Sequence, residues 1–223
     1  MVHTLARLGA DRVALRSVPG LVFWRVLGTG AGSNTGPGAD LHRSALFAVW
    51  RDEASLDAFE QRMATRWATA DETWHVRLRG AGGHGTWGGV PVLDLIEPAR
   101  GTDGPIAFVT RAHVHLRAWR AFRAAGDPVS DELQRAAGLL AAVGVGEAPV
   151  GRLGTFSLWH DLASARTFAT ELPHHRDVVR RTRGEGWYGE ELFARFEPYA
   201  SSGTWDGRDP LRDDRASTGI NMP

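Results

Sequence analysis

Hydrophobic residues recur along this chain at two spacings, one typical of strands and one typical of helices. Apolar–polar alternation or a short apolar run predicts β-strands, here at residues 21–27, 44–50, 72–78, 105–114, 139–145, 156–158 and 187–196. Apolar residues three and four apart predict helices, here at 3–17, 52–70, 116–125, from 131 onward, and between 161 and 183 with a break at Pro173. Glycine-rich or polar segments predict loops at 28–39 and 80–91, a linker at 98–104, and an irregular tail after Trp205.

The order of these elements repeats once along the chain. The segment 47–59, FAVWRDEASLDAF, aligns with 156–168, FSLWHDLASARTF, and the segments 76–87 and 194–205 both end in Gly-Thr-Trp. Residues 20–28 align in the same way with 138–146. A repeated unit of strand, helix, two strands, helix and strand is a ferredoxin-like βαββαβ. Two such units in one chain predict an α+β fold, a pseudo-dimeric α+β barrel.

The two predicted repeats differ at their beginnings. We assign residues 1–97 to the first repeat, 104–205 to the second and 206–223 to an irregular tail. The strand at 105–114 that opens the second repeat has no counterpart in the first, which begins at its helix. Three explanations stay open: the first copy is trimmed, another chain donates the strand, or the true start lies upstream.

The stretch 156–196 carries the candidate functional residue. Helical spacing from His175 reaches Val178, Val179 and Thr182, an apolar stripe, whereas spacing from His174 reaches a largely polar one. His175 is therefore expected to point inward and His174 outward. An inward histidine is more often a hydrogen-bonded core residue than a ligand. Its counterpart in the first repeat is Arg66, which favours a role beyond the shared framework.

Composition excludes several classes of chemistry. All 26 basic residues are arginine and equal the 26 acidic ones, so the net charge is zero and nothing indicates nucleic acid. Without lysine or cysteine, a Schiff base, a disulfide, a thiolate haem ligand and an iron–sulfur cluster drop out. We find no apolar run long enough to span a membrane and no secretion signal. These features predict a cytoplasmic protein.

Several segments together resemble the spheroidene monooxygenase family of carotenoid oxygenases. They are GLVFWRVLGTGAG (20–32), LFAVWRDEAS (46–55), GPIAFVTRA (104–112), VGEAPVGRLGTFSLW (145–159), HRDVVRRTRGEGWYGEELFARF (175–196) and GTWDGRDPL (203–211). The resemblance implies a haem-dependent monooxygenase that inserts oxygen at an allylic carbon of a lipophilic polyene. The chain departs from the family pattern at residues 113–116 and at Arg123, where the family has a basic, proline-containing stretch and a tryptophan.

The resemblance also extends, at the level of the fold, to haem-binding barrels such as chlorite dismutases and aldoxime dehydratases. There a helix histidine of the second unit ligates iron, which makes His175 the expected ligand of haem b and His174 the alternative. Trp159 and Val179 are expected to contact the cofactor. Alternation along 107–115 places Arg111 and His113 on one face, where Arg111 would assist a bound oxidant and His113 would shuttle protons. An ion pair for Arg111 and a surface position for His113 are the plainer alternatives.

Other interpretations are kept beside this one. The same barrel could carry a haem dehydratase or a peroxidase-like enzyme, a cofactor-free monooxygenase of the antibiotic-biosynthesis type, or a haem-binding protein without catalysis. His113 and His115 have the spacing of two ligands of a non-haem metal, but no supporting carboxylate follows. The expected partners are a small hydrophobic substrate, dioxygen or peroxide and an electron donor, with peripheral membrane contact and a homo-oligomer as further expectations.

Overall fold

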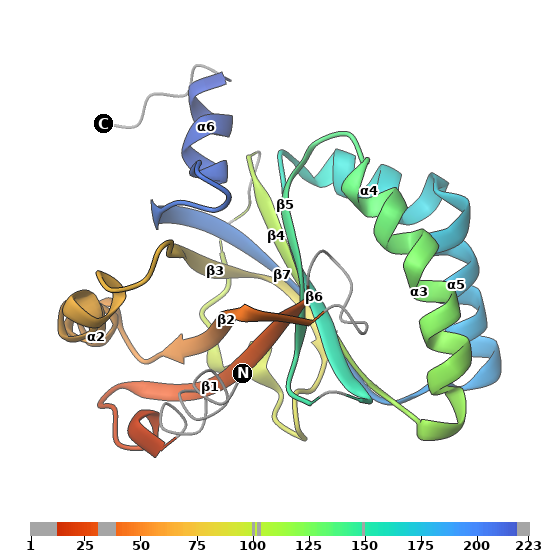
Figure 1. Ribbon diagram of the computed structural model, residues 1–223, viewed down its shortest axis with the longest axis horizontal. Coiled ribbons are helices and arrows are strands. Elements are labelled where there is room, and N and C mark those ends of the chain that lie inside the picture. Colours follow the sequence, from red (N-terminus) through yellow and green to blue (C-terminus); the bar gives the residue numbers. More distant parts are fainter. Residues whose placement is uncertain (1–12, 31–38, 100, 102–103, 149, 218–223) are drawn as a thin grey trace.

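A computed structural model describes residues 13–30, 39–99, 101, 104–148 and 150–217. Its centre is one curled antiparallel sheet of seven strands in the order β2-β1-β5-β6-β4-β7-β3 (Figure 1). The strands are β1 (Leu21–Gly30), β2 (Ala39–Trp50), β3 (Trp74–Gly85), β4 (Ile106–Val114), β5 (Leu139–Gly146), β6 (Arg152–Trp159) and β7 (Tyr188–Gly203). The helices are α2 (Glu53–Trp67), α3 (Trp119–Gln134), α4 (Leu162–Glu171), α5 (Pro173–Glu185) and α6 (Pro210–Ser217), with short 3₁₀ turns η1 (Val92–Leu95) and η2 (Leu116–Ala118). This architecture confirms the predicted fold class.

The curled sheet has an inner face and an outer face with different hydrophobic clusters. Because side chains alternate along a strand, β4 directs Ala107 and Val109 into the inner cluster and Phe108 into a cluster with Trp159 and Phe168 on the outer face. The helices α3, α4 and α5 lie together over the outer face of the second half (Figure 1). The helix α2 lies apart from them and covers a separate cluster in the first half.

The repeat seen in the sequence is visible in matching local contacts. Asp52 and Asp161 each accept a hydrogen bond from the backbone N–H three residues on, at 2.7 Å, and so cap α2 and α4. Gly20 and Gly138 precede β1 and β5 with φ of 75° and 78°. A Cβ added at either glycine would overlap the serine side chain that follows the cap. The same sequence signals therefore build the same corner twice.

Replacing Gly138 with alanine tests this corner. The left-handed backbone alone costs about 1–2 kcal/mol for a residue with a Cβ, and the overlap with Ser164 adds about 1–3 kcal/mol. Gly89 is the matched control, because its φ is 77° and an added Cβ would have no atom within 4 Å. Urea unfolding should show a larger loss of stability for Gly138→Ala than for Gly89→Ala. Equal losses of stability in the two variants would contradict the expected overlap between an added Cβ at position 138 and Ser164.

A second matching feature joins the two halves of the chain. Glu190 on β7 accepts hydrogen bonds from Thr86 and from the backbone of Gly89, both at 2.7 Å, in the first Gly-Thr-Trp turn. Glu72, just before β3, accepts in the same way from the second such turn, through Thr204 at 3.0 Å and the backbone of Gly207 at 2.8 Å. Each half thus provides the carboxylate that fixes the turn of the other.

The structure corrects three expectations of secondary structure. β3 continues through Gly85, within the expected loop, because Gly83 and Gly85 let its backbone lie against β7, where a Cβ would overlap carbonyl oxygens. α3 is one helix through Pro128, although a proline in a helix interior removes a backbone hydrogen bond, and Leu133 beyond the proline is buried. The tail forms α6, held by Leu211, which is 1% exposed, and by a 2.6 Å contact from His160 to Asp214. Most of the helix expected at 3–17 and of the loop at 28–39 lies outside the described residues.

The strand order also shows where the first half is incomplete. In the second half, β4 lies between β6 and β7 and pairs antiparallel with both. The equivalent strands of the first half, β2 and β3, form the two ends of the sheet. Among the described residues, no further strand joins these two ends to each other. Within the described ranges, the first half therefore has no counterpart of β4.

Candidate functional site

The predicted ligand His175 lies in the first turn of α5, where the helical layer changes direction. α4 ends at Glu171, and Leu172 is extended, with φ of −78° and ψ of 128°, as is usual for a residue before proline. Pro173 then begins α5, a position where its missing N–H costs no helical hydrogen bond. The local sequence therefore fixes both the break and the direction in which α5 starts.

Both the backbone and the ring of His175 are held in place. Its N–H donates to a carboxylate oxygen of Glu132 on α3 at 3.2 Å, and its Nδ1 lies 3.1 Å from the carbonyl oxygen of Ala169. The ring packs on Phe168 with centroids 4.8 Å apart. Burial lowers the pKa of the imidazole, so the neutral form prevails at neutral pH. Because a carbonyl only accepts, Nδ1 carries the proton and Nε2 keeps the lone pair that a metal ligand needs.

His174 points the other way, as its sequence pattern predicts. Its side chain is 57% exposed, and its Nδ1 lies 2.6 Å from Glu132, which also accepts from the His174 backbone at 3.3 Å. Burial opposes ionisation of Glu132, but these hydrogen bonds outweigh it and lower the pKa of its carboxyl group. Glu132 therefore stays charged and caps the N-terminus of α5 from a neighbouring helix.

The two other expected cofactor contacts differ in their surroundings. Trp159 is only 2% exposed, and its indole N–H donates to the hydroxyl of Ser157 at 3.0 Å. Phe168 stands between Trp159 and His175, with its ring centroid 5.4 Å from that of Trp159. Trp159 thus belongs to the core beneath the site. Val179 is 37% exposed, one turn after His175 on α5.

Arg111 lies on the opposite face of the sheet from His175. Its side chain is 4% exposed inside the barrel, and it forms ion pairs with Glu147, at 3.2 Å, and with Glu190. Trp87 donates to the same carboxylate of Glu147 at 2.8 Å, and Arg25 lies 3.5 Å from it. We call these five residues the buried ion cluster. The structure therefore gives Arg111 the ion pairs of the plainer alternative and does not bring it together with His175.

Glu190 is the most strongly perturbed carboxylate of the buried ion cluster. Its burial favours the neutral acid, but hydrogen bonds from Gly89, Thr86 and Arg111 outweigh this and lower its pKa to about 2. His113 follows Arg111 on the same inner face and is half-buried in register with Glu190. Neither Arg111 nor His113 faces the helical layer, so a distal role opposite His175 does not fit their positions.

The side of the sheet that faces the helices carries a cation that the sequence analysis did not single out. Arg195 lies on β7 beside Phe108 of β4, and its buried Nε has no hydrogen-bond partner among the described residues. Phe193, two residues earlier on the same face, is 36% exposed and packs on Phe108 at 5.5 Å. The alternation along 187–196 places Phe193 and Arg195 on one face, and this signal could have identified them.

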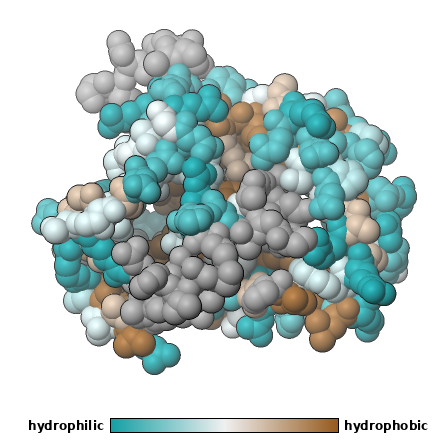
Figure 2. All heavy atoms as spheres, viewed as in Figure 1, coloured by the Kyte–Doolittle hydropathy of each residue, from teal (hydrophilic) through white to brown (hydrophobic). Residues whose placement is uncertain are grey.

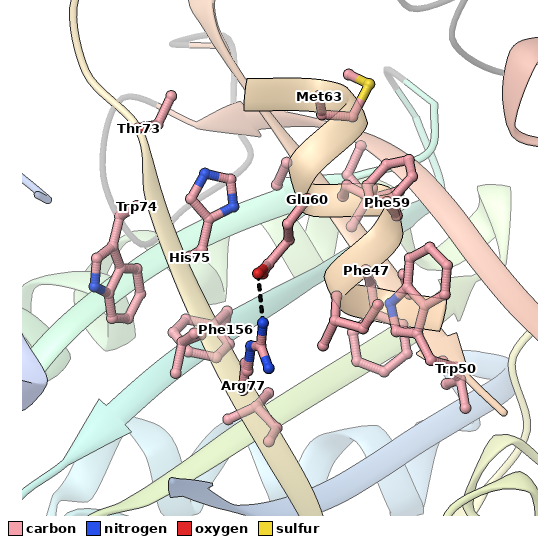
Figure 3. A pocket seen from close by; sticks show the side chains of 18 of the residues that line it. Phe47, Trp50, Phe59, Glu60, Met63, Thr73, Trp74, His75, Arg77 and Phe156 are labelled. Atoms are coloured by element: carbon pink, nitrogen blue, oxygen red, sulfur yellow. Dashed lines mark hydrogen bonds and ion pairs between the residues drawn. The ribbon is translucent and has the colours of Figure 1, made fainter. Parts of the chain in front are cut away.

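A cavity of about 1620 Å³ lies elsewhere, in the first half of the molecule. Figure 3 shows α2 with Phe59 and Glu60 on one side, His75 and Arg77 of β3 opposite, and Phe156 behind them. A hollow beside α2 is also visible on the surface in Figure 2. The ring of His75 packs against that of Trp67, with centroids 4.1 Å apart and the planes tilted by 38°, and burial lowers the pKa of His75. His175 is not among the residues that line this cavity.

The described residues contain neither a cluster of metal-binding side chains nor a membrane-spanning helix. No group of three or more histidine, cysteine, aspartate or glutamate side chains in the described part of the chain could hold a metal ion. This does not test a haem, which takes a single protein ligand on one side. Within the same residues, no helix is both long and apolar enough to cross a membrane.

Three curated relatives align with most of this chain, and each is named spheroidene monooxygenase. The protein of Rhodobacter capsulatus is 32% identical over 213 residues, covering 93% of this chain and 88% of the relative. The protein of Rubrivivax gelatinosus is 36% identical over 193 residues, covering 85% and 73%. The chain belongs to the spheroidene monooxygenase family. It spans 65% of the length of a third member, from Cereibacter sphaeroides, to which it is 33% identical.

Comparisons with family profiles and with solved structures add little to this family membership. No protein-family profile matches the chain. Among solved structures, a candidate monooxygenase of Fusobacterium nucleatum is 9% identical, with a TM-score of 0.43 over 90% of this chain and 88% of the other. A second candidate monooxygenase, from Lactobacillus acidophilus, is 8% identical, with a TM-score of 0.41 over 87% and 90%.

Proposed function

We propose that this chain is a haem-dependent monooxygenase of a small hydrophobic, polyene-like substrate, with His175 as the iron ligand. The observation that carries the proposal is the ring of His175, neutral and fixed through Nδ1 to Ala169, so that Nε2 keeps the lone pair that a ligand needs. Membership of the spheroidene monooxygenase family supports the reaction class and the substrate class. When bound, the haem supplies the oxidising chemistry, with dioxygen or peroxide and an electron donor as co-reactants.

The side chains on the helix-covered side of the sheet have the chemistry that a flat apolar group with an anionic edge would need. Glu132 and Ala169 orient the ligand through its backbone and its ring. Phe193 and Val179 offer exposed apolar surface on β7 and α5, where contact with the cofactor would bury them. The Nε of Arg195, which has no hydrogen-bond partner within the described ranges, offers a hydrogen bond and a positive charge to a carboxylate such as a propionate. Arg111 and His113 do not enter this site.

Haem titration and turnover test the proposed function. Purified protein titrated with haem should develop a Soret band that saturates at one haem per chain, and the loaded protein should oxygenate a polyene when reductant and dioxygen are supplied. A saturating Soret band without oxygenation would indicate a haem carrier or a dehydratase instead. Oxygenation by haem-free protein would favour the cofactor-free alternative.

Replacing Glu132 with alanine should weaken haem binding without removing the ligand. The variant loses the cap that holds the first turn of α5, so His175 is less well oriented, and groups that support a ligand are worth about 10-fold or more in affinity. Asp131→Ala is the control, because Asp131 is the exposed neighbour on α3. The dissociation constant from Soret titration checks this. Equal affinity of both variants would contradict a positioning role for Glu132.

A further inference from the structure

We propose that one end of the second half of the molecule is a docking surface for an anionic lipid membrane. This end is formed by η2, the first turn of α3, the last turn of α5 and the turn between β5 and β6. We call it the arginine edge, and its residues are Leu116, Arg117, Arg120, Val150, Arg152 and Arg183. The inference depends neither on the proposed haem site nor on the cavity of the first half.

Contacts between distant segments make the arginine edge one surface. The backbone N–H of Val114 donates to the carbonyl oxygen of Gly151 at 2.7 Å, which places η2 beside the turn between β5 and β6. The guanidinium of Arg117 donates to the carbonyl oxygen of Gly186 at 3.3 Å, which places η2 beside the end of α5. The start of α3 and the end of α5 accordingly lie at the same end of the helical layer (Figure 1).

Two apolar side chains project from adjoining turns of the arginine edge. Leu116 is 79% exposed and Val150 is 46% exposed. Single exposed apolar residues are common on protein surfaces, but these two come from turns that a backbone hydrogen bond joins. Val114 and Ala118, two residues before and after Leu116, are buried and anchor the turn. Leu116 is therefore presented to solvent by a fixed piece of backbone.

The arginine edge also carries positive charge. Its four arginines are all exposed, and none of them forms an ion pair with a carboxylate among the described residues. The neighbouring Arg181 differs, because it forms an ion pair with Glu185 at 2.9 Å, so that this carboxylate is already used. Since the whole chain has 26 basic and 26 acidic residues, the excess of charge at this end is local. Such a surface attracts an anionic partner.

A lipid bilayer fits both features better than an acidic protein does. An anionic headgroup layer attracts each nearby arginine and raises binding by about 5-fold for each one. The hydrocarbon beneath accepts Leu116 and Val150 without a matching pocket, and burial of the leucine adds about 10-fold or more. An acidic protein would satisfy the arginines, but it would need a cavity shaped for two side chains that project from turns. The two features together therefore favour the membrane.

Sedimentation with lipid vesicles tests the charge of the arginine edge. The purified chain should bind vesicles of phosphatidylcholine with about one-third phosphatidylglycerol, and it should bind less as salt is added. Vesicles of phosphatidylcholine alone should bind it far more weakly. Arg120→Gln combined with Arg183→Gln should weaken binding to the anionic vesicles about 25-fold. The control is Arg135→Gln with Arg166→Gln, which removes the same charge from exposed positions at the end of α3 and on α4. This pair should change binding by less than about 3-fold.

A fluorescent label tests whether Leu116 enters the bilayer. Because the chain has no cysteine, Leu116→Cys gives one site for a polarity-sensitive dye. Its emission should shift to the blue with anionic vesicles, whereas a dye at Leu95→Cys, on η1 and 41% exposed in the original leucine, should not respond.

Three results would overturn the proposal: equal binding to neutral and anionic vesicles, equal binding of the two arginine pairs, or no binding at all. Arginine-dependent binding with the dye at position 116 still in water would indicate a site for an acidic protein and would also overturn the membrane contact.

Discussion

Replacing His175 with alanine should abolish haem binding while the fold survives. The variant removes the single imidazole proposed to hold the iron. Among the described histidines, no other lies in the first turn of α5 with its ring packed on Phe168. Its side chain is only partly buried, so removal leaves a modest cavity and costs about 1–2 kcal/mol of stability. Haem affinity, measured by Soret titration, should fall by more than about 100-fold.

The adjacent histidine provides the control for this prediction. His174→Ala changes the same residue type in the same turn, but its side chain points outward and is 57% exposed. The variant loses its side-chain contact with Glu132. Its haem affinity should nevertheless stay within about 3-fold of the affinity of the unmodified chain. Circular dichroism and urea unfolding should show both variants folded. If His174→Ala loses the Soret band and His175→Ala keeps it, the assignment of the ligand is wrong.

Glu190→Gln should strongly destabilise the protein at neutral pH. The amide keeps the size of the side chain but leaves Arg111, which is 5% exposed, with a partner only in Glu147. The pKa of Glu190 near 2, against about 4.5 when unfolded, corresponds to about 3 kcal/mol. Breaking a buried ion pair by removing one partner costs a similar amount. Urea unfolding at pH 7 measures the difference.

The pH dependence of this loss has a defined sign. A carboxyl group whose pKa falls on folding stabilises the protein above its unfolded pKa and loses that contribution as the pH falls toward its folded pKa. The difference between the unmodified chain and Glu190→Gln should therefore be full above about pH 5 and shrink as the pH approaches 2. Glu72→Gln is the matched control, because Glu72 anchors the equivalent turn and its ion-pair partner Arg43 is 38% exposed. This variant should lose less than about 1 kcal/mol of unfolding free energy. Equal losses for the two variants would contradict the buried ion cluster.

Local sequence signals predicted most of the elements correctly. The break at Pro173 was predicted and is where α5 begins, and the structure shows Asp52 and Asp161 as caps and Gly186 at the end of α5, because each of these effects depends on a few neighbouring residues. The alternation along 105–114 gave the two faces of β4. It could not tell which face the helices cover, and so it could not show that Arg111 and His175 are separated by the sheet.

Errors of the sequence analysis came from contacts between distant segments. The glycines after Gly80 are typical of a loop, yet they form a strand because β7 lies against them. α6 forms in a polar tail because Leu211 finds a buried position. Arg195 was missed because its lack of a partner depends on what β3 and β4 place beside it.

The sequence by itself determined the repeated α+β framework and the membership of the spheroidene monooxygenase family, because both are encoded in short patterns and their order. Only the tertiary structure decided that Arg111 belongs to an ion cluster inside the barrel, that His175 is held by Ala169 and Glu132, and that a large cavity lies in the first half of the molecule. The physical reason is that these facts depend on which surfaces of separate elements face each other, and spacing along the chain does not contain that information.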